Sequence, residues 1–261
     1  MREKSENITD KLPAAAALIL IVLIWQFLSM TGIVPAYMLP SPVAVVKAFI
    51  EDFSNIMFHA FTTLREAAYG LLIGIVLAFC MAAAMDRFEL LHRALYPIMI
   101  ITQTIPTIAL APVLVLWMGF GMAPKITLVV ITTFFPIAVS LLDGFKGADP
   151  DAIDLLRAMG ANRKQIFYHV KIPSALPHFF SGLKVSASYA VVGAVISEWL
   201  GGFEGLGVYM TRSRKAYAFD RMFAVILLIV VISLLLMRLV SVLGNLAMPH
   251  LKVQKVRHRR N

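Results

Sequence analysis

Long apolar runs alternate with short charged segments along most of the chain. The runs cover residues 12–30, 67–85, 94–124, 126–142, 179–200 and 222–246. A helix that rises about 1.5 Å per residue needs roughly 20 apolar residues to cross about 30 Å of hydrocarbon. The pattern therefore predicts an all-α polytopic membrane protein with six transmembrane helices.

The run at residues 94–124 differs from the others because it is thirty-one residues long and carries no charge. That length exceeds one straight span and is too short for two spans with a loop. Pro97, Pro106 and Pro112 fall inside it, and internal prolines are tolerated in spans where neighbours satisfy the freed backbone groups. We expect one broken span of about 25 residues, with a bent outer end near residues 119–121.

The first run has an alternative interpretation as a secretory signal peptide. A signal peptide has a shorter apolar region and a small-residue cleavage site after it. Here the run leads into residues 31–35 without such a site, which favours a retained span. Residues 43–58 mix apolar and charged positions, which predicts a surface helix.

The polar stretch at residues 149–173 is the longest one between the apolar runs. Asp149 followed by Pro150 is typical of a helix start, because the side chain caps free N–H groups and the proline suits the first turn. Gly160 ends this helix where the chain needs a left-handed residue. Ile153, Leu156 and Met159 recur at helical spacing and form one apolar stripe.

A second short helix follows the glycine. Asn162 and Gln165 have the spacing of a capping box, and the helix carries Ile166, Phe167 and Val170. We expect Pro173 to end it. The sequence thus predicts two short helices joined by an elbow at Gly160, whose apolar residues must dock on another surface.

Composition agrees with the membrane class, since 59% of residues are hydrophobic and the mean hydropathy is +0.80. The net charge of +9 fits the excess of Lys and Arg in cytoplasmic loops. With the N-terminus inside, fifteen basic residues lie on the cytoplasmic side and seven outside. This topology makes the 149–173 stretch cytoplasmic, together with the tails 1–11 and 248–261 that flank the transmembrane domain 12–247.

The chain lacks the motifs of several catalytic classes. It has no G-x-x-x-x-G-K-[ST] phosphate loop, no His, Cys and carboxylate cluster with metal spacing, and no hydrolase elbow. Its one cysteine, Cys80, excludes a disulfide framework. We expect a non-catalytic protein without a cofactor or metal of its own.

The 149–173 stretch resembles the EAA loop of binding-protein-dependent ABC transporter permeases, whose pattern is E-A-A, three residues, G, nine residues, I, one residue and L-P. Asp154, Leu155 and Leu156 stand at E-A-A, Gly160 at the glycine, and Val170, Ile172 and Pro173 at I, L and P. Only Gly160 and Pro173 are identical to the pattern. The resemblance implies that these residues, with Ala158 and Ala161, contact an ATP-binding subunit that carries ATP and Mg. The alternative is an amphipathic linker on the membrane surface.

Most of the chain, about residues 12–247, resembles the nitrate/sulfonate/taurine branch of these permeases. The motifs are LPSP at 39–42, QTIPTIALAPVLVLWMGFG at 103–121 and EWLGGFEGLG at 198–207. The resemblance implies the type I ABC importer permease fold in a prokaryotic cell membrane. It also implies a homodimer, two ATPase subunits and an extracytoplasmic solute-binding protein that delivers a small solute of that type.

Two alternatives concern the transported solute and the mechanism. Residues 209–225 resemble, less closely, the members associated with pyrimidine precursors of thiamine. A stand-alone secondary carrier is the other alternative, and it calls for ionisable residues deep in several spans.

Polar residues inside the spans are candidates for the solute path. Gln103, Thr104 and Thr107 lie beside Pro106, where a broken helix exposes backbone groups as transporter sites do. The alternative is that the threonines bond their own backbone and Gln103 contacts a neighbouring helix.

The 179–200 run adds three further candidates. Ser186 and Tyr189 are as compatible with packing as with the path. Glu198 is the one carboxylate that the sequence places near a span interior, where an acid is a functional candidate. Its alternatives are a position at the membrane interface, capping of the 201–207 turn, or pairing with Arg212 or Arg214.

Overall fold

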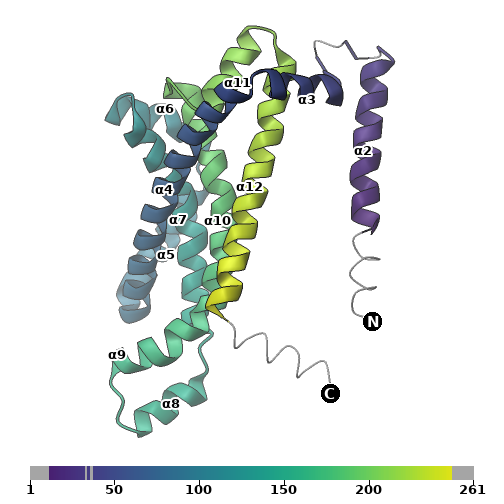
Figure 1. Cartoon of the computed structure of the whole chain (residues 1–261). Coiled ribbons are helices and arrows are strands. Elements are labelled where there is room, and N and C mark those ends of the chain that lie inside the picture. The colour runs from purple at the N-terminus through teal and green to yellow at the C-terminus, as the bar shows by residue number, and fades with distance from the viewer. Residues whose placement is uncertain (1–11, 33, 36–37, 249–261) are drawn as a thin grey trace. The chain divides into compact units, whose positions relative to one another are not determined.

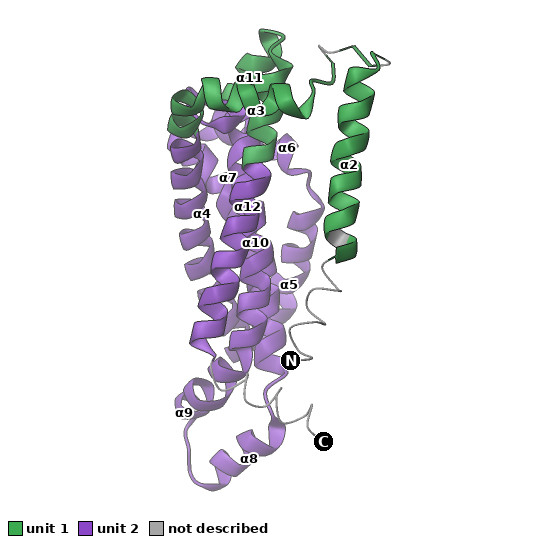
Figure 2. Cartoon of the chain, turned by 45° about the vertical axis from the view of Figure 1, so that its right-hand side comes forward, with its two compact units in different colours: residues 1–59, 209–228 green, residues 60–208, 229–261 purple. Residues whose placement is uncertain are grey.

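The computed structural model describes residues 12–32, 34–35 and 38–248, and the regular structure in these ranges is helical (Figure 1). The predicted tails 1–11 and 248–261 therefore lie outside the described residues, apart from residue 248. The chain divides into two compact units (Figure 2): unit 1 holds residues 1–59 and 209–228, and unit 2 holds residues 60–208 and 229–261.

Unit 1 contains α2 (Leu12–Met30) and α3 (Pro42–Glu51). The helix α2 has the bounds predicted for the first span. The Ser41 side chain accepts a hydrogen bond from the Ala44 N–H and caps the start of α3. The Trp25 indole N–H donates to the Pro40 carbonyl at 2.9 Å, which ties α2 to the segment that precedes α3.

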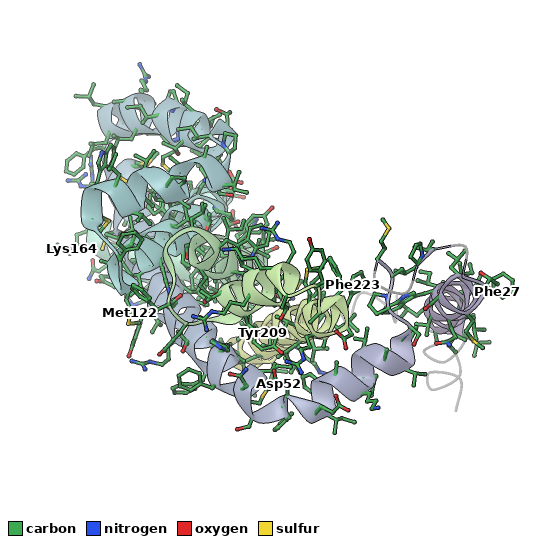
Figure 3. All side chains as sticks on the ribbon, turned by 90° about the horizontal axis from the view of Figure 1, so that it is seen from above. Phe27, Asp52, Met122, Lys164, Tyr209 and Phe223 are labelled. Carbon is green, nitrogen blue, oxygen red and sulfur yellow. The ribbon has the colours of Figure 1, made fainter. Side chains whose placement is uncertain are left out.

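The prediction of a single surface helix over residues 43–58 is wrong, because the helix breaks at Asp52. α3 ends at Glu51, and α4 (Phe53–Arg87) begins after Asp52, whose φ and ψ are −111° and 24°. The Asp52 carboxylate accepts a hydrogen bond from the Tyr209 hydroxyl at 2.6 Å (Figure 3). Burial, reinforced by the Asp52 charge, raises the pKa of Tyr209 above its usual range. The partner lies 157 residues away in the sequence, so the local pattern cannot show the break.

Unit 2 is built on the long helices and the segments that join them. Beyond most of α4 it contains α5 (Glu89–Thr104), α6 (Thr107–Met118), α7 (Met122–Lys146), α8 (Pro150–Ala158), α9 (Arg163–Ile166), a π-helical turn (Phe167–Lys171), α10 (Ile172–Gly201), the start of α11 (Leu206–Lys215) and the later part of α12 (Phe219–Ala247). In Figure 1, α8 and α9 lie at the end of unit 2 where α10 begins.

The described helices account for four or five of the six predicted spans by length and composition. Four are long and apolar enough to cross a membrane: Phe53–Arg87, Met122–Lys146, Arg163–Leu200 and Phe219–Ala247. α5 and α6 make a fifth if the bent pair is one span, whereas the apolar part of α2, Ala15–Met30, is shorter.

α7 and α10 approach each other closely through small residues. A Cβ added at Gly144 would lie 2.6 Å from the Ala175 Cα, and one added at Gly182 would lie 2.6 Å from the Pro136 carbonyl oxygen. Around this contact α4, α7 and α10 enclose an apolar core that includes Ala78, Ala82, Ile137, Ala138, Leu142, Phe145 and Ala187. Small residues at such contacts let helix backbones pack where lipid offers no hydrophobic drive between helices.

The predicted break in the 94–124 run is present, but its sharp bend lies at a different place. α5 and α6 meet at 101°, across Ile105 and Pro106, while Gly119 only ends α6. Ile105 has an extended backbone (φ −77°, ψ 122°), which is the conformation that a following proline favours. Pro97 and Pro112 remain inside α5 and α6, so Pro106 is the proline that breaks the run.

The prediction that Pro173 ends the second short helix is also wrong. The helix continues from Arg163 to Leu200 through the π-helical turn, and Pro173 lies in the first turn of α10. The Ile172 N–H bonds the Phe167 carbonyl, five residues back. A π-turn changes the local bonding register, so the missing proline N–H does not terminate the helix.

We expect Gly182→Leu to destabilise unit 2, because the new side chain would enter the contact between α10 and α7. Overpacking of this kind costs about 1–3 kcal/mol. The measurement is thermal unfolding of the full-length chain in detergent, followed by size-exclusion chromatography. Ser181→Leu is the matched control, since Ser181 is exposed on the same helix; equal melting temperatures for the two variants would contradict the assigned contact.

Candidate functional sites

The 149–173 segment forms the two-helix elbow that the sequence predicts. The Asp149 carboxylate accepts a hydrogen bond from the Asp151 N–H at 3.0 Å and caps α8. Asn162 and Gln165 make both bonds of a capping box at the start of α9, at 2.7 and 3.0 Å. Between the helices Gly160 has φ +81°, which is a left-handed conformation that glycine adopts without steric cost.

Several apolar side chains of the elbow are uncovered within the chain. Leu155 is 62% exposed and Met159 is 74% exposed, whereas Ile153 and Leu156 are half-buried. The other residues assigned to ATPase contact divide in the same way: Asp154, Ala158, Gly160 and Pro173 are exposed, and Ala161, Val170 and Ile172 are half-buried. The elbow thus presents its backbone turn and part of its apolar surface outward.

A half-buried ion pair ties the elbow to α4. The Lys171 ammonium contacts both carboxylate oxygens of Asp86, at 2.6 and 2.8 Å. Beside it lies a cavity of about 1050 Å³ whose lining includes five cations, Arg87, Arg157, Arg163, Lys164 and Lys171. Fixing Lys171 on Asp86 holds the π-helical turn against the end of α4.

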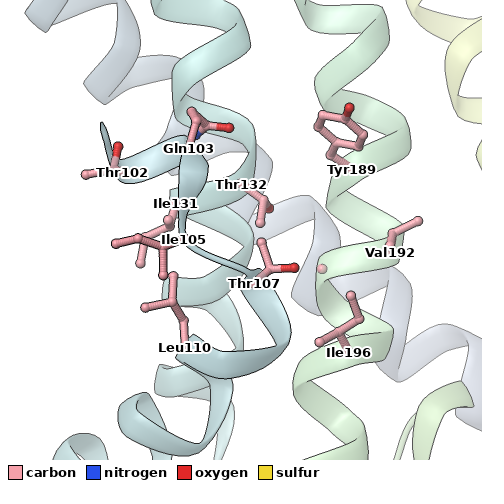
Figure 4. A pocket seen from close by; sticks show the side chains of 11 residues that line it. Thr102, Gln103, Ile105, Thr107, Leu110, Ile131, Thr132, Tyr189, Val192 and Ile196 are labelled. Carbon is pink, nitrogen blue, oxygen red and sulfur yellow. The ribbon is translucent and has the colours of Figure 1, made fainter. Parts of the chain in front are cut away.

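The break between α5 and α6 opens a second cavity, of about 250 Å³ (Figure 4). Its lining residues are Thr102, Gln103, Ile105, Thr107, Leu110, Ile131, Thr132, Tyr189, Val192, Gly193 and Ile196. α7 contributes Ile131 and Thr132, and α10 contributes Tyr189. We call this cavity the break pocket; its lining contains hydroxyl, amide and aromatic groups and no charged side chain.

The break pocket brings together three of the six path candidates. Gln103, Thr107 and Tyr189 line it, whereas the Thr104 hydroxyl bonds the Ile101 carbonyl of its own helix at 2.8 Å. Ser186 is buried and donates to the Thr133 carbonyl at 2.9 Å. The contacts of Thr104 and Ser186 therefore agree with the alternatives, in which the threonine bonds its own backbone and the serine packs between helices.

The sequence interpretation missed two polar residues of this pocket. Thr102 belongs to the same polar run as Gln103, which is a signal that sequence reasoning could have used. Thr132 enters from α7, and no local pattern connects it to the break.

Glu198 lies outside the break pocket, in a buried polar cluster at the C-terminal end of α10. Its two carboxylate oxygens accept hydrogen bonds from the Thr63 hydroxyl at 2.7 Å and from the Gly207 N–H at 2.6 Å. The Leu206 N–H in turn donates to the Thr63 oxygen at 2.9 Å. Of the alternatives for Glu198, capping the 201–207 turn is the one that these contacts support.

The expectation that Glu198 is the one carboxylate near a span interior is wrong. Glu66 is completely buried, with 0% exposure. It lies near the middle of α4, which begins at Phe53, and so it is a second carboxylate in a span interior. Its carboxylate accepts from the Lys125 ammonium at 2.6 Å. Lys125, which is one of the seven basic residues that the predicted topology places outside, is 5% exposed.

Residues 70–246 match the family described as "Binding-protein-dependent transport system inner membrane component". This match covers more than half of the chain, which therefore belongs to that family of integral inner-membrane transport proteins. The chain is thus an inner-membrane component of a transport system, as the related permeases are.

Two relatives are named for the solutes they transport. The formylaminopyrimidine transport permease protein ThiX of Halalkalibacterium halodurans is 36% identical over 237 residues, which cover 90% of this chain and 94% of the relative. The putative aliphatic sulfonates transport permease protein SsuC of Bacillus subtilis is 29% identical over 214 residues, covering 81% of this chain and 78% of the relative. The chain is thus similar to permeases named for two different solutes.

A solved structure agrees in fold. A chain of the MetNI methionine ABC transporter, in inward-facing conformations, superposes with a TM-score of 0.59 at 20% identity, covering 74% of this chain and 94% of that chain. The likeness shows the helical fold of ABC importer permeases, as the resemblance predicted.

Thiol labelling checks the assignment of the break pocket. In a Cys80→Ser background, Gln103→Cys and Tyr189→Cys should react with a small water-soluble thiol reagent, because both positions line the break pocket and both side chains are exposed. Ser186→Cys is the control on the same helix as Tyr189 and should be protected, since Ser186 is fully buried. Equal labelling of all three would contradict the assignment.

Proposed function

We propose that this chain is the permease subunit of an ATP-driven importer that takes up a small solute delivered by an external binding protein. Two copies of the chain would form the translocation unit, and a separate ATP-binding subunit would dock at the elbow. ATP and Mg would be bound by that subunit. The observation that carries the proposal is the direct connection of the elbow to α7 and α10, two of the helices that line the break pocket.

The connection runs through regular structure on both sides of Gly160. α9 continues through the π-helical turn into α10 as one apolar helix from Arg163 to Leu200. On the other side, α8 begins four residues after α7 ends at Lys146. A partner that displaced the elbow would therefore move α7 and α10 together, and with them two walls of the break pocket.

The exposed residues of the elbow suit contact with a partner subunit. Gly160 projects with nothing within 4 Å of a Cβ placed on it, and Leu155 and Met159 are largely uncovered. These groups are available to a partner subunit, and the amphipathic linker on the membrane surface is the alternative that ATPase recovery tests. The excess of Lys and Arg on this side supports a cytoplasmic location for the elbow and for both termini.

The break pocket favours a neutral polar solute over an anion. A sulfonate or nitrate that left water for a site without a cation would lose its hydration without an ionic partner. Gln103, Thr107 and Tyr189 instead offer hydrogen bonds and an aromatic face. Together with the similarity to a formylaminopyrimidine permease, this supports a pyrimidine precursor of thiamine as the solute, in preference to a solute of nitrate/sulfonate/taurine type.

Gly160→Val should abolish uptake and weaken association with the ATP-binding subunit. A β-branched residue in the left-handed conformation costs about 1–2 kcal/mol, and its side chain would project into the docking surface. The measurements are recovery of the ATPase with an affinity-tagged chain and ATP-driven uptake in proteoliposomes. Gly160→Asn is the control, because asparagine tolerates this backbone conformation. It should keep more of the ATPase association and more of the uptake than Gly160→Val does.

Membrane insertion of the valine variant separates a local defect from misfolding. Normal ATPase recovery and uptake by an inserted Gly160→Val chain would refute the role of the elbow. Solute uptake by the wild-type chain alone, without any ATPase, would instead support the stand-alone carrier.

Tyr189→Ala should raise the KM for uptake of the solute by about tenfold, which corresponds to the loss of roughly 1.4 kcal/mol of binding. Tyr189→Phe should change it less, because the aromatic face remains. Uptake is measured in proteoliposomes with the ATPase and binding protein present, using a formylaminopyrimidine and, in parallel, an alkanesulfonate. Transport of the sulfonate alone would overturn the solute assignment and leave the importer mechanism standing.

A further inference from the structure

The buried cluster at the end of α10 contains one more acid than base. Glu66, Glu198 and Lys125 are 0%, 1% and 5% exposed. Two ionised carboxylates and one ammonium would leave one uncompensated negative charge away from water. An unpaired buried charge costs several kcal/mol, and buried groups commonly change protonation state to avoid it.

Lys125 is the one buried Lys or Arg side chain among the described residues. The buried His59 of α4 packs against the Tyr209 ring, with 5.6 Å between the ring centroids. Arg65 neighbours Glu66 on α4, but it is exposed and its guanidinium lies over the Phe61 ring, 5.7 Å from the centroid. Lys125 is already shared between the Glu66 carboxylate and the Glu204 carbonyl, at 2.6 and 3.3 Å. Glu198 also sits in the last turn of α10, where the helix dipole is negative and disfavours a carboxylate.

One carboxylate oxygen of the cluster lacks a partner. Glu66 Oε1 accepts from Lys125, whereas the buried Glu66 Oε2 has no hydrogen-bond partner among the described residues. Glu198 lies beside it in the cluster, because Thr63, three residues before Glu66 on the same helix, donates to the Glu198 carboxylate at 2.7 Å. Both groups are acceptors when ionised, so a hydrogen bond between them forms only if one carries a proton.

We propose that Glu66 and Glu198 share one proton and form, with Lys125, a proton-binding cluster of zero net charge that fixes the 202–207 turn. The shared proton gives Glu66 Oε2 its missing partner and removes the excess charge in a single step. The turn depends on it directly, because Glu198 accepts from the Gly207 N–H and a Cβ at Gly205 would overlap the Glu198 carboxyl. The inference is independent of the transported solute and of the coupling partner.

Infrared spectroscopy of the full-length chain in detergent tests the proposal. At neutral pH the exposed carboxyls are ionised, so wild type should show one carbonyl stretching band of a protonated carboxylic acid, which shifts in D₂O. Absence of this band in the folded wild-type chain overturns the proposal, whatever the variants do.

Single substitutions assign the band to the pair. Glu66→Gln should remove it, because the remaining Glu198 would be ionised opposite Lys125. Glu198→Gln should also remove it, because the pair between Glu66 and Lys125 remains. Lys125→Met should keep or strengthen it, because two buried carboxyls without a cation hold at least one proton.

Glu204→Gln is the matched control and should leave the band unchanged, since Glu204 is exposed in the same turn. A purely structural role for the acids predicts instead that both Glu→Gln variants retain the wild-type spectrum, which would refute the shared proton. If one variant fails to fold, the other variant and the wild-type band still decide the outcome.

Discussion

The close packing of α7 on α10 is the contact on which the rest of unit 2 depends. Lipid tails are as apolar as the helices, so association within a membrane relies on tight van der Waals contact between small residues. Gly144 and Gly182 provide that contact, where any side chain would collide with Ala175 or with the Pro136 carbonyl. The same two helices continue to the elbow at one end and line the break pocket between their ends.

The two ends of α10 differ in how firmly they are held. At its C-terminal end Glu198 binds Thr63 on α4 and the Gly207 N–H, and the neighbouring Lys125 of α7 joins the same cluster. At its N-terminal end the helix extends into the exposed elbow, which the half-buried Lys171–Asp86 pair ties back to α4. A force applied to the elbow therefore acts on a helix whose far end is fixed by buried hydrogen bonds, and this arrangement suits a lever.

The break pocket lies between these two ends because of a single proline. Pro106 forces Ile105 out of the helical conformation, and the resulting bend of 101° separates α5 from α6. Backbone and polar groups that a straight helix would cover then face α7 and α10. Thr104 and Thr102 limit the cost by bonding carbonyls of their own helix, and Gln103, Thr107 and Tyr189 are the lining side chains that offer hydrogen bonds to a solute.

The sequence by itself determined the elements whose causes are local. The elbow follows from Asp149, Gly160 and the Asn162–Gln165 box, and the helical class follows from the length of the apolar runs. The tertiary structure alone decided which polar groups meet, because Glu66, Lys125 and Glu198 lie on three different helices and their pairing leaves no periodic signal. It also decided that the helix continues through Pro173, since the π-helical turn before this residue changes the register of the backbone hydrogen bonds.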